Sequence, residues 1–131
     1  MQLVFDTTAL SQVLASDDNL LRALHQQSWE QLLIPLAVDA ELRFGFKAGN
    51  RERQNLQVYE TFVNEFSLAI SYPDQTTSLI YADLAAWCRQ KGLSLSNNDL
   101  WIAASCVQHA GKLLTLDWDF KQLPQVNLLL V

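Results

Sequence analysis

Hydrophobic residues along the chain fall into short continuous runs and into longer segments with helical spacing. The short runs occupy residues 2–5, 31–34, 67–72, 112–116 and 126–130. Brief apolar runs of this kind are typical of strands that are buried on both faces of a sheet. Between the runs, apolar residues at helical spacing predict helices after residue 8, around residues 20–24, and over residues 35–49, 50–66, 76–90 and 99–110.

Strands that alternate with helices predict an α/β protein. The sheet is expected to be mainly parallel, with four or five strands, and to be covered by helices on both faces in three α/β/α layers. The 131 residues fit one domain, 1–131, which is long enough to bury a core. Glycines mark predicted helix ends at Gly49, Gly92 and Gly111.

The charge of the chain limits its partners. Acidic residues outnumber basic ones by 14 to 9, which gives a net charge of −5. This charge argues against indiscriminate nucleic-acid binding, but it does not exclude a nucleic-acid substrate if several carboxylates bind a cation. Arg43, Lys47 and Arg51 recur at steps of four and would share one face of a continuous helix. This row predicts either a solvated face or contacts to a phosphate backbone.

Two features bear on the compartment. Cys88 and Cys106 both lie in helical segments among apolar residues, which predicts buried free thiols and a reducing environment. The first residues, MQLVFDTTAL, lack the basic region of a signal peptide, and no apolar run approaches the roughly 20 residues of a transmembrane helix. We therefore expect a soluble, cytoplasmic protein with no membrane partner.

Four acids stand at junctions between predicted elements. Asp6 follows the first strand, Asp117 follows the fourth, Asp99 begins a helix after a polar Ser-Asn-Asn run, and Glu41 lies on the helix after the second strand. Ligands of parallel α/β sheets bind outside the carboxyl ends of the strands, where such residues gather. Each acid also has a structural alternative: Asp6 as a helix cap, Asp99 as a charge favoured by the helix dipole, and Glu41 as a surface residue.

Carboxylates that gather in one cleft repel unless a cation neutralises them. No histidine or cysteine accompanies these acids at zinc-ligand spacing, and oxygen ligands favour Mg²⁺ or Mn²⁺, the ions of many nucleases. The sequence has no phosphate-binding loop with a lysine, no dinucleotide fingerprint and no GxSxG motif. Thr8 stands where a phosphatase of the aspartyl-phosphate type needs a second acid, so that chemistry is disfavoured.

The motifs FDTTAL, AELRFG, NNDLWIAAS and LLTLDWDF, in this order, resemble the PIN-domain nucleases and especially the small VapC-like toxins of bacterial toxin–antitoxin pairs. The resemblance spans nearly the whole chain and implies a PIN-like fold. By position, it implies an acidic quartet that binds Mg²⁺ or Mn²⁺, made of Asp6, Glu41, Asp99 and Asp117.

The resemblance also implies supporting residues around the quartet. Thr7 or Thr8, together with Thr115, match the hydroxyl residues that hold the metal shell or its water. The family commonly has Asn where this chain has Thr8, and Asp119 competes with Asp117 for the fourth acidic position. We prefer Asp117 because it is nearer the strand end. Candidates for contacts with the substrate are Arg43, Lys47 and Asn97.

The function implied by the resemblance is a metal-dependent endoribonuclease, active as a homodimer and inhibited by a cognate antitoxin. The antitoxin would insert a peptide near the acids, often with an arginine, and the helical hairpin over residues 36–66 resembles the region that forms its groove. The RNA would be cut in an unpaired loop. The alternatives are a noncatalytic PIN-like module that binds RNA or a protein partner, and a nuclease that acts on DNA.

Overall fold

A five-stranded sheet forms the centre of the computed structural model, which describes residues 1–15 and 17–130. The strands are β1 (Gln2–Phe5), β2 (Gln31–Pro35), β3 (Ala69–Ser71), β4 (Lys112–Thr115) and β5 (Asn127–Leu130). All pairings are parallel, in the order β3-β2-β1-β4-β5. The sheet confirms the predicted α/β class. It was expected to be mainly parallel, and all its strand pairings are parallel.

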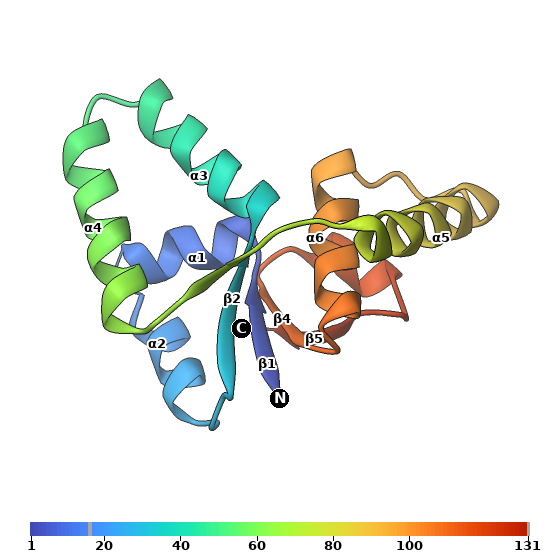
Figure 1. Ribbon diagram of the computed structural model, residues 1–131, viewed down its shortest axis with the longest axis horizontal. Helices are drawn as coiled ribbons and strands as arrows, with labels where there is room; N and C mark the ends of the chain where they lie inside the picture. The colour runs from blue at the N-terminus through green and yellow to red at the C-terminus, as the bar shows by residue number, and fades with distance from the viewer. Residues whose placement is uncertain (16, 131) are drawn as a thin grey trace.

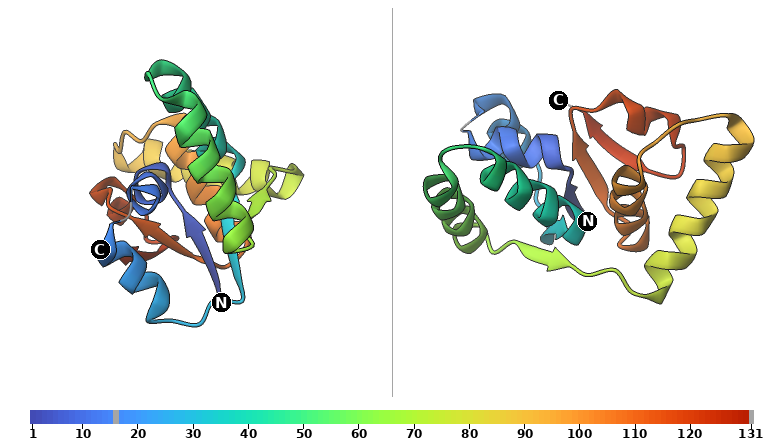
Figure 2. Two further views of the ribbon diagram at one scale, coloured as in Figure 1. Left: turned by 90° about the vertical axis from the view of Figure 1, so that its left-hand side faces the viewer. Right: turned by 90° about the horizontal axis from the view of Figure 1, so that it is seen from above.

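The helices lie on the two sides of this sheet (Figures 1 and 2). On one side are α1 (Thr7–Leu14), α2 (Asp18–His25), α3 (Leu36–Ala48) and α4 (Glu52–Glu65). On the other are α5 (Gln75–Lys91) and α6 (Asn97–Gln108). A short 3₁₀ helix, η1 (Trp118–Gln122), joins β4 to β5. Right-handed crossovers explain this division, because the chain moves outward from β1 to β3 and then returns to the other side of β1.

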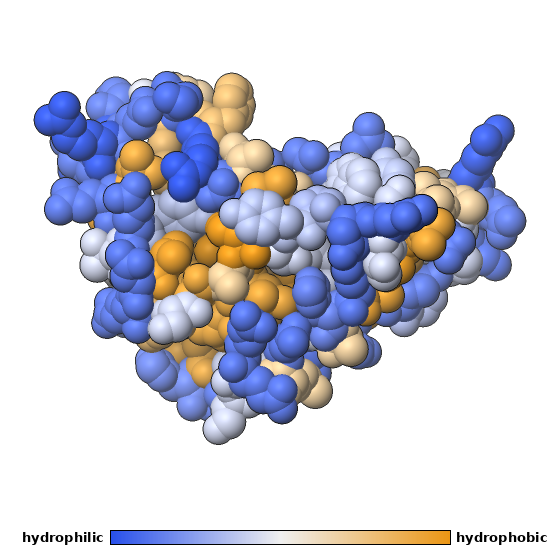
Figure 3. Space-filling view, in the orientation of Figure 1, coloured by the Kyte–Doolittle hydropathy of each residue, from blue (hydrophilic) through white to orange (hydrophobic). Residues whose placement is uncertain are grey.

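Apolar burial is concentrated at the central strand. Leu3, Val4 and Phe5 of β1 are fully buried between the helical layers, which is why the first strand reads as a continuous apolar run. Within the described residues, no helix is both long enough and apolar enough to cross a membrane. The space-filling view shows apolar side chains gathered over the middle of one face, with charged side chains around them (Figure 3).

Two predicted boundaries need correction, those of the third strand and of the end of α6. The third strand is only Ala69–Ser71, because Ser67 takes a left-handed conformation with φ of 53° and closes α4, with the Leu68 N–H donating to the Val63 carbonyl. Helix α3 ends at Ala48, so Arg51 does not continue the row of Arg43 and Lys47 on one helix.

The end of α6 also differs from the expectation. Ala110, not a glycine, occupies the left-handed position with φ of 50°, and the Gly111 N–H donates to the Cys106 carbonyl. Gly111 is needed for a different reason. A Cβ there would lie 2.9 Å from the Gln2 carbonyl oxygen, so this glycine lets the loop approach β1 closely.

Candidate active site at the carboxyl end of the sheet

Asp6 is the most buried acid of the site, with 2% of its surface exposed. It follows β1 directly and caps α1, since its carboxylate accepts the Ala9 N–H at 2.7 Å. Phe5 of β1 pairs with Leu114 of β4, which brings the next residues of the two strands, Asp6 and Thr115, side by side. The Thr115 hydroxyl donates to the second carboxylate oxygen of Asp6. Asp6 is therefore both the cap of α1 and a candidate residue of the site, two roles that the sequence offered as alternatives.

Thr115 also fixes the acid that follows it. Its hydroxyl oxygen accepts the Asp117 N–H at 2.8 Å. Asp117 caps η1 and accepts the Asp119 N–H at 2.9 Å, which holds the turn after β4. Thr115 is fully buried, whereas Asp119 is exposed. One hydroxyl thus links the ends of β1 and β4 to the loop that carries Asp117.

Asp99 lies in the first turn of α6, but it is not the residue that caps this helix. The Ser96 hydroxyl accepts the Asp99 N–H at 3.1 Å and performs that role. The Asp99 side chain is partly buried. Because the cap is already supplied, the carboxylate of Asp99 remains available for another contact.

Glu41 comes to the site from α3. It is partly buried and accepts a hydrogen bond from the Thr7 hydroxyl at 2.8 Å, which joins α3 to the start of α1. Thr8, the next residue, is exposed on α1. Of the two threonines that match the family motif, Thr7 is the one in contact with a candidate acid.

The electrostatics show that these acids affect one another. Burial raises the pKa of Asp6 to about 6. Hydrogen bonds from Thr115 and from the Ala9 N–H lower the pKa of Asp6, while the negative charges of Asp117 and Asp99 raise it. Asp6 is thus a carboxyl that resists ionisation in the absence of a cation.

Asp99 experiences a similar environment. Burial raises its pKa, a hydrogen bond with Ser96 lowers it, and the charges of Asp117, Glu41 and Asp119 raise it. The negative charge of Asp117 raises the pKa of both Asp6 and Asp99. The four predicted acids therefore converge in one electrostatic cluster at the carboxyl edge of the sheet.

The donor set of this cluster fits a hard divalent cation, because all its charged groups are carboxylates. Among residues 1–15 and 17–130, however, no three acidic, histidine or cysteine side chains are close enough to hold a metal ion. The carboxylates are close enough to affect one another's pKa values, but they do not form a closed shell of metal ligands.

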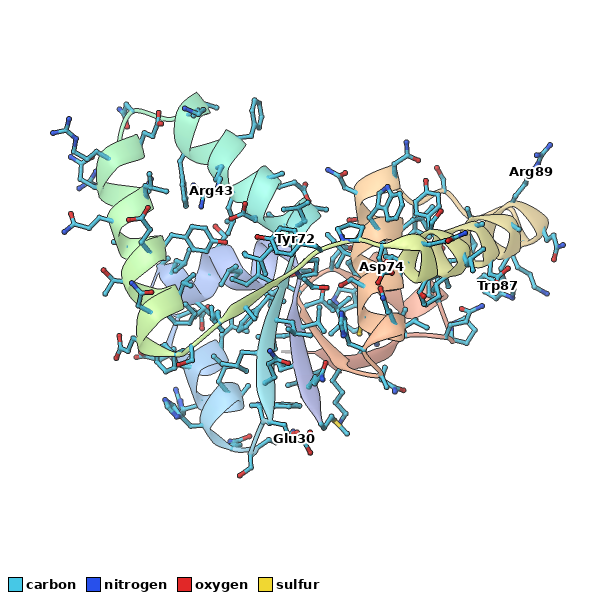
Figure 4. All side chains as sticks on the ribbon, viewed as in Figure 1. Glu30, Arg43, Tyr72, Asp74, Trp87 and Arg89 are labelled. Atoms are coloured by element: carbon cyan, nitrogen blue, oxygen red, sulfur yellow. The ribbon has the colours of Figure 1, made fainter. Side chains whose placement is uncertain are left out.

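The other predicted residues make contacts outside the quartet of acids. Arg43 is paired with Asp39 at 3.1 Å and lies over the Tyr59 ring, within the α3–α4 hairpin (Figure 4). Lys47 is paired with Glu52 at 3.1 Å. Asn97 accepts a hydrogen bond from the Tyr81 hydroxyl at 3.1 Å beside the start of α6. Arg43 and Asn97 each lie two residues from an acid of the cluster, Arg43 from Glu41 and Asn97 from Asp99.

Two features of the fold were not anticipated from the sequence. Ser71 at the end of β3 hydrogen-bonds with both Ser105, at 3.0 Å, and His109 Nε2, at 2.9 Å, and so ties α6 to the sheet. Trp118 is exposed next to Asp117, with the Lys121 ammonium over its ring. Apolar periodicity does not single out these residues, although a tryptophan between two acids is a signal in its own right.

Comparison with known proteins agrees with this geometry. The PIN-domain family model matches residues 3–126. Ribonuclease VapC2 of Rickettsia felis is 31% identical over 98 residues, which cover 74% of this chain and 72% of the relative.

Solved structures give the same result. The structure of VapBC2 from Rickettsia felis, bound to a promoter DNA fragment, matches with a TM-score of 0.91 and 25% identity over 100% of this chain and 99% of the other. VapBC-5 from Mycobacterium tuberculosis matches with a TM-score of 0.77 and 26% identity over 99% and 98%. These matches confirm the predicted PIN-like fold and the predicted VapC-like character. The chain therefore belongs to the PIN-domain family, as a VapC-type toxin of the VapBC toxin–antitoxin systems.

Proposed function

We propose that this protein is a Mg²⁺- or Mn²⁺-dependent endoribonuclease. The observation that carries the proposal is the gathering of Asp6, Asp99, Asp117 and Glu41 at the carboxyl edge of the sheet, where burial and, to a smaller extent, the neighbouring carboxylates raise the pKa values of Asp6 and Asp99. The name of the Rickettsia relative, a ribonuclease, supports RNA as the substrate. PIN-domain nucleases are metal-dependent as a family, and a carboxylate-only site suits either ion.

Each residue of the cluster has a role in this proposal. Asp6, Asp99 and Asp117 hold the cation, and Glu41 completes the site or orients the attacking water. Thr115 positions two of these acids through its contacts with Asp6 and with the Asp117 N–H. A bound cation supplies Lewis acidity at the phosphodiester and lowers the pKa of a coordinated water.

Thr7 and Asp119 have supporting roles. The Thr7 hydroxyl fixes one oxygen of Glu41, which leaves the other for a water. We assign the fourth acidic position to Asp117 rather than Asp119, since Asp117 acts on both Asp6 and Asp99 while exposed Asp119 acts on Asp99 alone. Asp119 instead donates its N–H to Asp117 and holds the turn.

The test is cleavage of RNA by purified protein with Mg²⁺ or Mn²⁺. Asp6→Asn and Asp99→Asn keep the size of each side chain and remove its charge, so we expect cleavage to fall by at least about a hundredfold, the scale of losing a group that stabilises transition-state charge. Chelation with EDTA should have the same effect. Metal uptake, followed by calorimetry, should weaken in both variants.

The matched control is Asp83→Asn, which removes one charge from an exposed position on α5 outside the cluster. This variant should cleave as the unmodified protein does. Full activity in both Asp6→Asn and Asp99→Asn would contradict the assignment. Cleavage of no RNA, with metal-independent RNA binding retained, would favour a noncatalytic binding module, and cleavage of DNA alone would change the substrate.

The cognate antitoxin is the proposed protein partner. A groove of about 530 Å³ runs between α1, α2 and α4, with apolar walls that include Leu14, Leu21, Val58 and Phe62. Such a groove suits the apolar face of an amphipathic helix. The sequence-based expectation placed this groove on the hairpin of residues 36–66. Its α4 half lines the groove, while the opposite wall is α1 and α2.

Assembly and compartment complete the proposal. Leu36, Tyr72 and Leu79 are large apolar side chains exposed near the junctions of β2 with α3 and of β3 with α5, and a second copy would cover them in a homodimer. Light scattering would measure the oligomer. Cys88 and Cys106 are buried and unpaired, which fits a toxin that acts in the reducing cytoplasm.

A further inference from the structure

Trp118 is unusually placed for a large aromatic residue. It is 67% exposed, whereas tryptophan side chains are normally buried to a high degree. It is the first residue of η1 and stands directly between Asp117 and Asp119. Asp117 accepts the Asp119 N–H across this residue, so the backbone of Trp118 is held in the turn that directly follows β4 and carries Asp117.

A lysine accompanies this ring. The Lys121 ammonium lies 3.5 Å from the centroid of the Trp118 ring, in a close cation–π contact. Within the described part of the chain, the salt bridges join Glu30 to the amino terminus, Asp39 to Arg43 and Glu52 to Lys47, so none of them engages Lys121. Lys121 therefore carries a positive charge that forms no salt bridge among the described residues, and it lies on η1, the helix that Asp117 caps.

We propose that Trp118 is a stacking platform for an unpaired RNA base next to the cleaved phosphate, and that Lys121 contacts the RNA backbone there. The inference rests on the proposed ribonuclease function and adds a substrate-binding pair to it. Single-stranded RNA is held by aromatic side chains on which bases stack and by cations that follow the phosphates. The ammonium covers one face of the ring, and the high exposure of the residue leaves surface for a base on the other.

The same pair is poorly suited to the centre of a protein interface. Lysine is depleted there, because burying an ammonium without a counter-charge costs free energy. RNA supplies the counter-charge in its phosphates. Among the nine basic residues, Lys121 is the one on η1, the helix that Asp117 caps.

The experiment measures binding of a short, unstructured, fluorescein-labelled RNA by anisotropy, in an Asp99→Asn background that prevents cleavage. Trp118→Ala should raise the Kd roughly five- to a hundredfold, the range for losing one stacked base. Trp118→Phe keeps an aromatic face and should restore most of the affinity. Lys121→Gln should lower the slope of log Kd against log salt by about 0.7, as expected for one lost phosphate contact.

The chain offers a matched control pair. On α5, Lys91 lies over the Trp87 ring at 6.0 Å, at the outer end of that helix (Figure 4). Trp87→Ala and Lys91→Gln make the same chemical changes away from the acids and should leave the Kd and the salt slope unchanged. Thermal melting curves of each variant should be compared with that of the unmodified protein to check that the variant is folded.

The outcomes separate this inference from the proposed function. If the unmodified protein cleaves RNA and Trp118→Ala binds it with unchanged Kd, the stacking platform is wrong and the ribonuclease assignment stands. If the unmodified protein cleaves no RNA with either metal, the proposed function itself fails. Loss of binding to the antitoxin, with RNA affinity unchanged, would assign Trp118 to a protein interface and overturn the inference. A Trp118→Phe variant as weak as Trp118→Ala would also contradict stacking.

Discussion

At the scale of single residues, Asp6 combines two requirements that conflict. As a cap of α1 it stabilises the fold by accepting the Ala9 N–H. As a buried acid near Asp99 and Asp117 it is costly to ionise, so its pKa rises to about 6. The Thr115 hydrogen bond offsets part of this cost. A site that works with a cation therefore carries a stability penalty when the cation is absent.

This conflict predicts a pH dependence of stability in the metal-free protein. The pKa of Asp6 is raised from 3.8 in the unfolded chain to about 6 in the fold, so between these values the folded state binds more protons. Stability must then fall as pH rises from about 4 to about 6, by up to roughly 3 kcal/mol for a shift of this size. Urea unfolding in EDTA at about pH 4.5 and about pH 7 measures the difference.

Substitution isolates the contribution of Asp6. Asp6→Asn retains an oxygen that can cap α1 but cannot ionise, so the fall in stability with rising pH should be much reduced. Asp83→Asn, on the exposed surface of α5, should keep the full dependence. Equal slopes in the Asp6→Asn variant and the unmodified protein would show that Asp6 does not carry the effect. Adding Mg²⁺ at neutral pH should recover stability in the unmodified protein.

At the scale of elements, the ends of α6 show what sequence patterns can and cannot predict. Ser96 is a good helix-starting residue and does cap the helix. At the other end, Gly111 was expected to end the helix, but Ala110 takes the left-handed conformation that closes it, and Gly111 is required by close packing on β1. Local propensity identifies a helix end. Only the tertiary contact with β1 determines which residue must be glycine.

The two neighbouring positions should respond in opposite directions to substitution. Ala110→Gly relieves a left-handed alanine and should stabilise the protein by up to about 1 kcal/mol. Gly111→Ala places a Cβ 2.9 Å from the Gln2 carbonyl oxygen and 3.0 Å from Val4 Cγ2. We expect it to destabilise by about 1–3 kcal/mol, as overpacking does. Thermal unfolding measures both, and a stable Gly111→Ala variant would show that the loop can move away from β1.

The same reasoning explains which parts of the site the sequence predicts. Asp6 and Asp117 follow apolar runs, and the ends of parallel strands meet at one edge, so their convergence follows from the pattern. Glu41 lies within a helix, and its contact with Thr7 and its effect on the pKa of Asp99 are what distinguish it from a surface acid. The 3₁₀ helix after Asp117 has no periodicity to reveal it. These details depend on how separate elements pack.

At the scale of the whole molecule, the edge that carries the acids and the groove are formed by different surfaces. The acids lie at the carboxyl ends of the central strands, while the groove lies between α1, α2 and α4. Helix α1 contributes to both, since Asp6 caps its start and Leu14 near its end lines the groove. This shared helix allows a partner in the groove to approach the acids without using the same residues.

The separation predicts a variant that escapes the antitoxin. Val58 lines the groove and is 47% exposed, so Val58→Asp places a charge in the apolar groove with little effect on folding. Affinity for the antitoxin should fall at least about tenfold, since an unpaired charge is costly to bury. RNA cleavage without the antitoxin should be unchanged. The control is Gln90→Glu, which adds a negative charge at an exposed position of α5 outside the groove. Unaltered antitoxin affinity in Val58→Asp would remove the groove from the interface.

The hydrogen bond between Thr115 and Asp6 spans 109 residues of sequence, and β1 pairs with β4 only when residues 112–115 are present. Chains are synthesised from the amino terminus, so a growing polypeptide carries Asp6 and Glu41 well before Thr115 and Asp117. The acidic cluster is therefore incomplete on the ribosome until nearly the whole chain has been made. A growing chain of this topology therefore lacks two of the acids that we propose for cleavage until it is nearly complete.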